Sequence, residues 1–580
     1  MATKSPKDKI FTKGSGEVAT TKQFLIKSII AASQNAGFHM EKINFTVEPA
    51  SNIQYGDYAS NIAMVLAAIG KKSPHAVAEN IITGLETNKR FNAVVKSVKV
   101  AGPGFINFSL SPEYLAKQIK NILSAKNNYG RIDIGHKQNV QVEFISANPT
   151  GPPTLGNGRG GFLGDALSNV LDFAGYKITR EYYVNDAGEQ IKKLGWSVIA
   201  AGKVSGGDYK IPYPPEELYP GGYVQELAYK LQISKFKPEE LNPEAISRTA
   251  SKMILEYIKR ITKKLKIRFD VWFSEKSLHR QGLIKEAYEA LQKKHLIEKK
   301  EGAQWLRLKE NDNINERVLI KSNGEPTYLL PDIAYHWDKF KRRRFDKVID
   351  IVGADHHAHM FTLNRVFASL GLVSSSRKFD FILVQLVRLM ENGQEVRMSK
   401  RTGTFITLEE LVDTVGLDAA RFFFLMREPN SHMDFDMTLA REQSDKNPVY
   451  YVQYAHARCA SILAKASSAG SGQAKQEGIV EGSARNNLLL KLAHPSETQL
   501  IKKLIILPEL VEDIASKYEV SRLPVYATDV ATVFSAFYRD CQVIGEDKDL
   551  TLARLALVRA TKIVLANTMR LMGIHAPERM

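Results

Sequence analysis

The segment from Val142 to Arg159 constrains the fold of this chain more than any other. An apolar strand is predicted over 140–145, and the chain then breaks at Asn148-Pro149 and enters a loop rich in glycine and proline. A long helical pattern opens near 158–161. Such a strand, loop and helix start can bind a phosphate, because free backbone N–H groups and the helix dipole point at the anion. A glycine loop by itself can also merely turn the chain.

The rest of the chain divides by pattern. Residues 136–445 alternate strands and helices, which predicts a doubly wound parallel α/β (Rossmann-like) sheet, with an insertion over about 192–325. A flexible leader is expected over 1–21, an α+β unit over 22–125, and an all-helical domain over 446–580.

Individual elements follow from hydrophobic periodicity and turn residues. The expected helices span 22–36, 58–68, 73–85, 112–125 and 408–415. The expected strands, besides 140–145, span 43–47, 95–100, 105–110 and 348–352, and an apolar run covers 381–390.

Bulk properties narrow the class of protein. A chain of 580 residues is long enough for about three or four domains. Its net charge of +17 suits a polyanionic partner such as RNA, although general solubility would also explain it. The two cysteines, Cys459 and Cys541, form no C-x-x-C pair, so we expect no zinc ribbon or disulfide framework and a reducing cytoplasm. The N-terminus lacks a signal-peptide core, and no apolar run is long enough to cross a membrane.

A second segment, Arg397-Met-Ser-Lys-Arg401, changes how the first is interpreted. Together the two resemble the signature-one loop and the KMSKS loop of class I aminoacyl-tRNA synthetases. Other runs make the chain similar to the arginyl-tRNA synthetase family, from about Asn44 to the C-terminus. The matching runs are Glu143–Gly151, Glu181–Gly188, Tyr328–His336, Gly353–His357 and Gly573–Met580. The resemblance implies an N-terminal tRNA-contacting domain, a class I catalytic domain and a helical anticodon-binding domain.

One departure from the family concerns the first signature. The family has two histidines in an H-x-G-H pattern that contact ATP phosphates, whereas this chain has Thr154 and Asn157. Threonine and asparagine can donate hydrogen bonds but cannot carry a positive charge. Either the site uses neutral donors, which we favour, or it is weakened. Ordinary helix-cap chemistry is the competing interpretation of both residues.

The resemblance implies where arginine binds. Glu143 and Asp332 would hold the guanidinium, because paired carboxylates match its planar fork. Tyr328 lies one helical turn before Asp332, so both can face one pocket. Further expected contacts are Ser146 and Asn148 at the amino and carboxylate end, and His356, where some relatives have glutamine. Without the surrounding motifs, Glu143 would be a surface carboxylate and Asp332 a helix-start residue.

The same resemblance implies an ATP site and a catalytic set. The catalytic candidates are Lys400, Thr154 and Asn157, of which Lys400 is favoured because a mobile lysine can follow the phosphates as the bond breaks. The ATP-binding candidates are Gly151, Thr154, Gly156, Asn157, Asp355, Met398, Ser399 and Lys400. A bare M-S-K triplet would otherwise indicate a basic surface loop.

RNA contacts are inferred from aromatic and polar clusters. The candidates are Tyr451, Tyr454 and Arg458 in the helical domain, with Asn61 and Asn107, and also Tyr58, in the N-terminal domain. Aromatic residues at helical spacing are more often core. The densest basic run, Lys339–Arg344, fits a solvated face about as well as tRNA binding.

The expected activity is the ATP-dependent attachment of L-arginine to tRNA(Arg) through an arginyl-adenylate. ATP would bring Mg²⁺ with it, and we expect no structural metal, no membrane association and a cytoplasmic monomer. The main alternative is a non-catalytic tRNA-binding paralogue that lost the signature histidines. A ligase for another amino acid and a nucleotidylyltransferase of related fold are disfavoured, the first by Glu143 and Asp332, the second by the long helical C-terminal domain.

Overall fold

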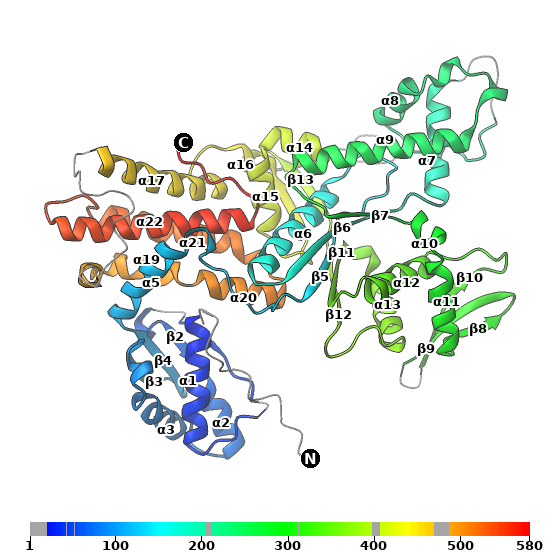
Figure 1. The fold of residues 1–580 in the computed structure, drawn as a ribbon. Coiled ribbons are helices and arrows are strands. Elements are labelled where there is room, and N and C mark those ends of the chain that lie inside the picture. Colours follow the sequence, from blue (N-terminus) through cyan, green and yellow to red (C-terminus); the bar gives the residue numbers. More distant parts are fainter. Residues whose placement is uncertain are drawn as a thin grey trace.

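The computed structural model describes residues 20–41, 43–50, 53–203, 210–310, 313–396, 406–468 and 486–580. Nearly all of the predicted leader and the whole of the second signature, Arg397–Arg401, lie outside these ranges. Figure 1 shows an N-terminal α/β unit below a bundle of C-terminal helices, with a parallel sheet beside that bundle. Two further groups of elements, one containing α7–α9 and one containing β8–β10, project from the sheet.

The N-terminal unit is a four-stranded antiparallel sheet covered by helices. Its strand order is β1-β2-β4-β3. The strands are β1 (Val47–Pro49), β2 (Tyr58–Ser60), β3 (Val95–Ala101) and β4 (Phe105–Leu110). The helices are α1 (Thr21–Asn35), α2 (Ile62–Gly70), α3 (Pro74–Glu86) and the short α4 (Lys89–Asn92). The predicted α+β class is confirmed for this unit.

Two local predictions in this unit are wrong. The helix expected over 58–68 begins only at Ile62, because Tyr58–Ser60 pairs as a strand with both β1 and β4. The strand expected over 43–47 lies later, at Val47–Pro49. In both cases pairing with distant strands, which the local pattern does not contain, decides the conformation.

The central sheet has five parallel strands in the order β12-β11-β5-β6-β7. These are β5 (Asn139–Glu143), β6 (Lys177–Val184), β7 (Val271–Ser274), β11 (Lys347–Gly353) and β12 (Lys378–Val384). After β5 the sheet grows in one direction to β6 and β7, and after β11 in the other direction to β12. The predicted doubly wound class is confirmed, and its topological switch point lies between β5 and β11.

Helices and two insertions surround this sheet. The helices packed on or near it are α6 (Leu155–Phe173), α12 (Leu329–Trp337), α13 (His357–Ser369), α14 (Leu408–Val415), α15 (Leu417–Leu425) and α16 (Met437–Arg441). The first insertion carries α7 (Glu189–Gly202), α8 (Gly222–Lys230) and α9 (Pro243–Lys264). The second carries α10 (Lys276–Arg280), α11 (Leu283–Lys293), β8 (Ile297–Lys300), β9 (Ala303–Glu310) and β10 (Asn313–Ile320). The interval expected to be one insertion thus contains β7, which returns to the parallel sheet between the two.

A small sheet and a helical bundle complete the chain. The expected apolar run 381–390 spans two strands, because the chain turns between β12 and β13 (Val387–Glu391), which pairs with β14 (Gln394–Glu395) and β15 (Met433–Asp436). The C-terminal helices are α17 (Pro448–Ser468), α18 (Asn486–Leu489), α19 (Pro495–Leu504), α20 (Leu507–Lys517), α21 (Arg522–Asp540) and α22 (Lys548–Leu571). The predicted all-helical class of this region is confirmed. None of the helices in the described ranges is both long and apolar enough to span a bilayer.

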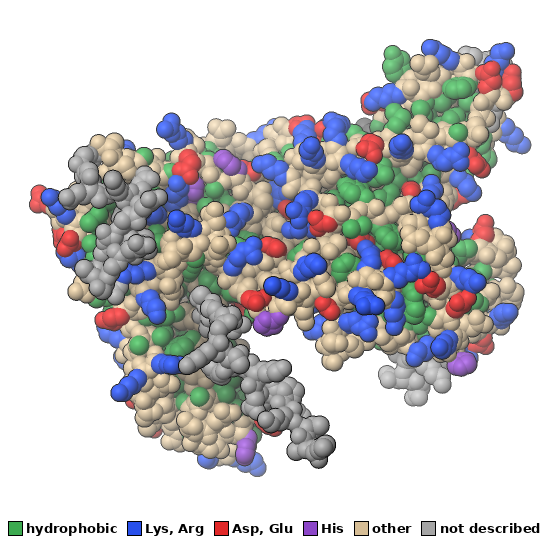
Figure 2. Space-filling model, in the orientation of Figure 1, with side chains coloured by type: hydrophobic (Ala, Val, Ile, Leu, Met, Phe, Trp, Pro, Cys, Tyr) green, Lys and Arg blue, Asp and Glu red, His purple; other side chains and the backbone are tan. Residues whose placement is uncertain are grey.

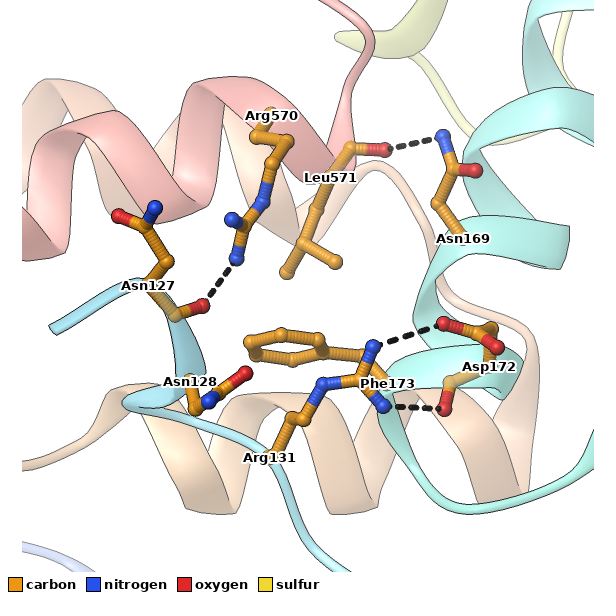
Figure 3. Close-up of a pocket in the computed structure, with 8 residues that line it drawn as sticks. All are labelled: Asn127, Asn128, Arg131, Asn169, Asp172, Phe173, Arg570 and Leu571. Atoms are coloured by element: carbon orange, nitrogen blue, oxygen red, sulfur yellow. Dashed lines mark hydrogen bonds and ion pairs between the residues drawn. The ribbon is translucent and has the colours of Figure 1, made fainter. Parts of the chain in front are cut away.

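Stacked arginines join the linker after α5 (Pro112–Ala125) to the other parts (Figure 3). The guanidinium groups of Arg131 and Arg570 lie 4.9 and 5.5 Å from the ring centre of Phe173, at the end of α6. Arg131 also pairs with Asp172 at 3.0 Å, and Arg570 donates to the carbonyl of Asn127. These residues line a cavity of about 290 Å³ and fix α22 against the sheet-based core.

A buried carboxylate connects the N-terminal unit to the helical bundle. Oε1 of Glu509, on α20, accepts from the backbone N–H of Lys22 at 2.8 Å and from the Tyr58 hydroxyl at 2.9 Å. Burial raises the pKa of the Glu509 carboxyl to about 7. Tyr58 is itself buried, so its side chain supports this interface and does not reach the surface.

Candidate active site

The loop after β5 has a strained backbone. β5 ends at Glu143, earlier than predicted, and Ile145 and Ser146 have φ angles of +68° and +40°. β6 holds this loop in place, because the Tyr182 hydroxyl donates to the carbonyl of Ala147 at 2.8 Å and the backbone N–H of Tyr183 donates to Ser146 Oγ at 3.1 Å. Non-glycine residues in the left-handed region concentrate at functional sites, where the surrounding structure supports the strain.

The first signature forms the start of α6, three residues earlier than the sequence pattern indicates. Thr154 is the N-cap, and the side-chain oxygen Oδ1 of Asn157 accepts from the Thr154 backbone N–H at 2.8 Å and from its hydroxyl at 3.0 Å. Both side chains therefore take part in cap chemistry. Within the described part of the chain, the Asn157 amide NH₂ and the backbone N–H groups of Leu155 and Gly156 remain as possible donors at the switch point.

Two glycines of this loop differ in what surrounds them. A Cβ at Gly156 would meet only Thr154 Oγ1, at 3.8 Å, so the protein leaves this position open. A Cβ at Gly151 would lie 3.2 Å from the Tyr223 ring. The space above Gly156 is what a nucleotide approaching the backbone requires.

The helix that follows the second signature lies beside the first signature. The backbone N–H of Leu408, the first residue of α14, donates to the carbonyl of Pro153 at 3.0 Å. A Cβ at Gly158 would come within 2.4 Å of the Leu408 side chain, so only glycine allows this close packing of α6 on α14. The predicted residues Met398, Ser399 and Lys400 lie outside the described residues, but the helix that follows them is fixed against the first loop.

Glu143 lies largely buried at the carboxyl end of β5. Its Oε2 is 2.7 Å from Nζ of Lys339, and its Oε1 accepts from the Ser146 hydroxyl at 3.0 Å. Burial raises the pKa of the Glu143 carboxyl, and the Lys339 ammonium opposes that rise. The structure thus brings two of the predicted arginine contacts, Glu143 and Ser146, together.

Asp332 and Tyr328 share the first turn of α12, as predicted. The backbone N–H of Asp332 donates to the carbonyl of Tyr328 at 3.3 Å, and the Tyr328 side chain is exposed. His359 contacts both of these residues. Its Nε2 lies 2.6 Å from Asp332 Oδ2, and its ring centre lies 5.1 Å from the ring centre of Tyr328. The predicted His356 is more exposed and lies 3.8 Å from Asp355. The sequence analysis missed His359, although it falls one turn after His356 on α13.

Tyr183 and Glu275 were also missed. Burial raises the pKa of the Tyr183 hydroxyl, and the negative charges of Glu275, Asp332 and Glu143 raise it further. Burial likewise raises the pKa of Glu275, with Asp332 adding to the effect. Three carboxylates from separate segments therefore act electrostatically on one buried tyrosine at the carboxyl edge of the sheet, which concentrates negative potential there. The sequence did contain a signal for Tyr183, because this tyrosine lies near the end of a strand and within the Glu181–Gly188 run.

The remaining predicted small-molecule contacts lie along the same edge. Asn148 donates its amide to Gln190 Oε1, at the start of α7. Asp355 directly follows β11 and its side chain is exposed. A parallel sheet places such residues at the edge where nucleotides bind.

The predicted RNA contacts differ in exposure. Tyr454 is 40% exposed, and the Arg458 guanidinium lies 4.6 Å from its ring centre. The Tyr451 hydroxyl instead donates to Ser535, at 3.3 Å. Asn61 accepts from the backbone N–H of Thr46, and Asn107 is buried in β4.

Positive charge is spread over the surface. Figure 2 shows Lys and Arg side chains over all parts of the visible face. The basic run Lys339–Arg344 is only partly a surface feature, because Lys339 is fully buried and Arg343 pairs with Glu181 and Asp338. The run Lys339–Arg344 is therefore neither a uniformly solvated face nor a continuous RNA-binding surface.

Comparisons with known proteins agree with this architecture. Three family models match in chain order: the arginyl tRNA synthetase N terminal domain over 23–110, the class I (R) tRNA synthetase catalytic domain over 118–201 and 216–443, and the DALR anticodon binding domain over 452–580. An arginine–tRNA ligase of Desulfitobacterium hafniense is 41% identical over 564 residues, which is 96% of this chain and 98% of the relative.

Solved structures give the same result. A putative arginyl-tRNA synthetase from Campylobacter jejuni is 31% identical, with a TM-score of 0.71, covering 81% of this chain and all of the other. The Thermus thermophilus arginyl-tRNA synthetase shares the fold at 23% identity, with a TM-score of 0.76 over 97% of this chain and all of the other. The chain belongs to the arginyl-tRNA synthetase family.

Proposed function

We propose that this protein attaches L-arginine to tRNA(Arg) at the expense of ATP. The observation that carries the proposal is that Glu143, Asp332 and Glu275 all act electrostatically on the buried Tyr183, at the edge of the sheet where the first signature also begins its helix. A pocket of carboxylates selects a cation, and the planar guanidinium fork suits paired carboxylate acceptors. The position of these carboxylates near a switch point of the sheet supports binding of the amino acid beside the nucleotide.

The first step is the activation of arginine. The carboxylate of arginine attacks the α-phosphorus of ATP, which gives arginyl-adenylate and diphosphate. Glu143 and Asp332 hold the guanidinium, with Tyr328 beside them, while Ser146 and Asn148 hold the amino and carboxylate end. We place the phosphates over Gly156 and the first turn of α6, with Gly151 and Asp355 on the nucleotide and Asn157 as the neutral donor.

Charge on the leaving diphosphate needs a cation, which Lys400 supplies with help from Ser399 and Met398 in the second signature. Mg²⁺ arrives with ATP as part of the substrate. In the second step, the terminal ribose hydroxyl of the tRNA attacks the mixed anhydride and releases AMP. Positioning and electrostatic stabilisation are sufficient for both steps, so no protein nucleophile is required.

The proposal also covers the tRNA contacts, the oligomeric state and the cellular location of the protein. We place the anticodon against Tyr454, Arg458 and Tyr451 on α17, and the N-terminal unit, with Asn61, against another part of the tRNA. Asn107 is buried in β4 and is therefore not a direct RNA contact. The protein acts as a cytoplasmic monomer without membrane association or a structural metal. A binding-only paralogue is less well supported, because the carboxylate pocket is intact although the signature histidines are absent.

The test is arginine charging of purified tRNA(Arg) by the wild type beside Asp332→Ala and Lys400→Ala. We expect the wild type to form arginyl-tRNA and both variants to lose nearly all activity. If the wild type binds the tRNA but forms no aminoacyl-tRNA with arginine or any other amino acid, the binding-only paralogue is the correct account.

A further inference from the structure

A buried ionic network lies directly behind the carboxylate pocket, in a place that the proposed chemistry does not use. Its centre is Lys339, in the π-helical turn Asp338–Arg342 that follows α12, and its side chain is completely buried. Its Nζ lies 2.7 Å from Oε2 of Glu143 and 3.0 Å from Oδ1 of Asp350, on β11. The same ammonium lies 4.1 Å from the ring centre of Tyr335.

A histidine extends this network to the second wall of the pocket. Nε2 of His336 lies 2.7 Å from Oδ2 of Asp350, and its Nδ1 lies 2.8 Å from the backbone carbonyl of Asp332. Both ring nitrogens of His336 thus lie within hydrogen-bonding distance of an oxygen atom. Asp350 therefore connects Lys339, which contacts Glu143, with His336, which contacts the backbone of Asp332.

The charges in this network explain why a lysine is needed. Removing a carboxylate from water favours its neutral form, and a buried carboxylate without a counterion takes up a proton. Lys339 supplies the counterion, and the carboxylates of Asp350 and Glu143 raise the pKa of its ammonium although burial opposes the charged form. Lys339 and His336 together hold the pKa of Asp350 at about 2, against the effect of burial.

We propose that Lys339 is a positioning residue that keeps Glu143 ionised and oriented, so that the pocket selects the positive charge of arginine. The inference rests on the proposed function, since it assigns Glu143 to the guanidinium. The other groups near Glu143 are Ser146 on its own loop, Tyr183 and Glu181 on β6, Tyr335 and His336 on α12, and Asp350 on β11. Of all these neighbours and Lys339, it is the Lys339 ammonium that directly contacts the Glu143 carboxylate as a cation.

The first experiment measures steady-state charging by Lys339→Met. Without the ammonium, burial favours the neutral form of the Glu143 carboxyl more strongly, and the neutral form attracts the guanidinium less. We expect the KM for arginine to rise about 30-fold at pH 6.5, with the KM for ATP within about twofold of the wild type. At pH 8.5 the carboxyl is more ionised, so the ratio of the variant KM to the wild-type KM should be no more than about half of its value at pH 6.5.

A neutral analogue separates charge from shape. Citrulline has nearly the shape of arginine but an uncharged ureido group, and it can be measured as a competitive inhibitor. We expect Lys339→Met to lower the ratio of the citrulline Ki to the arginine KM by about tenfold or more, because only the charged ligand loses attraction. A merely loosened pocket would weaken both ligands equally and would leave their ratio unchanged at every pH.

Two further variants complete the design. Lys341→Met makes the same substitution in the same turn at an exposed side chain, and its KM for arginine should equal that of the wild type. Because the single variant leaves two buried carboxylates without Lys339, the double variant K339M/D350N is measured in parallel and should show the same pH-dependent rise in KM. Unchanged KM and Ki ratios in Lys339→Met, or in K339M/D350N if the single variant does not fold, overturn the proposal. Failure of the wild type to charge arginine overturns the proposed function instead.

Discussion

The first signature and the carboxylate pocket lie side by side but are built in opposite ways. Thr154 and Asn157 bond to each other within one helical turn, so a short contiguous run forms the loop to which we assign the nucleotide. The pocket combines Glu143 from β5, Asp332 from α12 and Glu275 from the end of β7, and a buried lysine from a further turn supports it. The loop should therefore govern the chemical step through local donors, and the pocket should govern arginine binding through charge.

The largest expected effect tests the chemical side of this comparison. Lys400→Ala should lower kcat by about 1000-fold with little change in the KM for arginine, because a cation that follows the leaving phosphates acts mainly in the transition state. ATP–diphosphate exchange with arginine and tRNA present measures this step. Lys321→Ala, at an exposed lysine beyond β10, serves as the control.

Asp332→Asn tests the binding side. The substitution keeps the shape but removes a charge that we propose binds the guanidinium, so the KM for arginine should rise about 100-fold, equivalent to roughly 3 kcal/mol, with a smaller change in kcat. Steady-state charging at varied arginine gives both constants. Asp445→Asn, at an exposed aspartate, should behave as the wild type. A fall in kcat alone would contradict the assignment of this pocket to binding.

The two signature residues should differ from each other. Asn157→Ala removes the amide NH₂ that remains free to donate, and we expect kcat for ATP–diphosphate exchange to fall about tenfold. Thr154→Ala should lower it only about threefold, because that hydroxyl already donates to Asn157. If the threonine variant is the more damaged, Thr154 and not Asn157 is the donor to the phosphates.

A smaller effect, on the KM for tRNA, is expected in the helical domain, away from both the first signature and the carboxylate pocket. Tyr454→Ala should raise the KM for tRNA about fivefold and leave the KM for arginine unchanged, because an exposed ring can stack on a base. Tyr229→Ala, at an exposed tyrosine on α8, is the matched control. Equal effects of both variants on the KM for tRNA would remove the reason to place the anticodon at α17.

Glu509 shows what a buried carboxylate does away from the pocket. Its folded-state pKa of about 7 lies above the ordinary value of 4.5, so the folded protein binds the extra proton. The resulting stabilisation is present at low pH and is lost as the pH rises from about 5 towards 7. Thermal melts should therefore show Glu509→Gln gaining about 2 kcal/mol on the wild type between about pH 5 and pH 8, with no change in the KM for arginine. A parallel pH dependence of both proteins would contradict this account.

Local pattern predicted much of the fold. The helices at Pro112–Ala125 and Leu408–Val415, and the hairpin strands at Val95–Ala101 and Phe105–Leu110, lie within a residue of their expected positions. Each has its own turn, cap or periodicity. The helix expected from Tyr58 failed because its first residues pair with β1 and β4, and β7 was missed inside an expected insertion because it is short and pairs only with β6.

The sequence by itself determined which chemical groups this protein has: a glycine loop before a helix, a second signature, and the carboxylates Glu143 and Asp332. Only the tertiary structure decided how they are paired. It placed His359 and not His356 on Asp332, brought Glu275 to Tyr183, and buried Lys339 from a basic run between Glu143 and Asp350. The physical reason is that motifs and caps depend on neighbouring residues, whereas the charge state of a buried group depends on side chains that only the folded chain brings within a few ångströms.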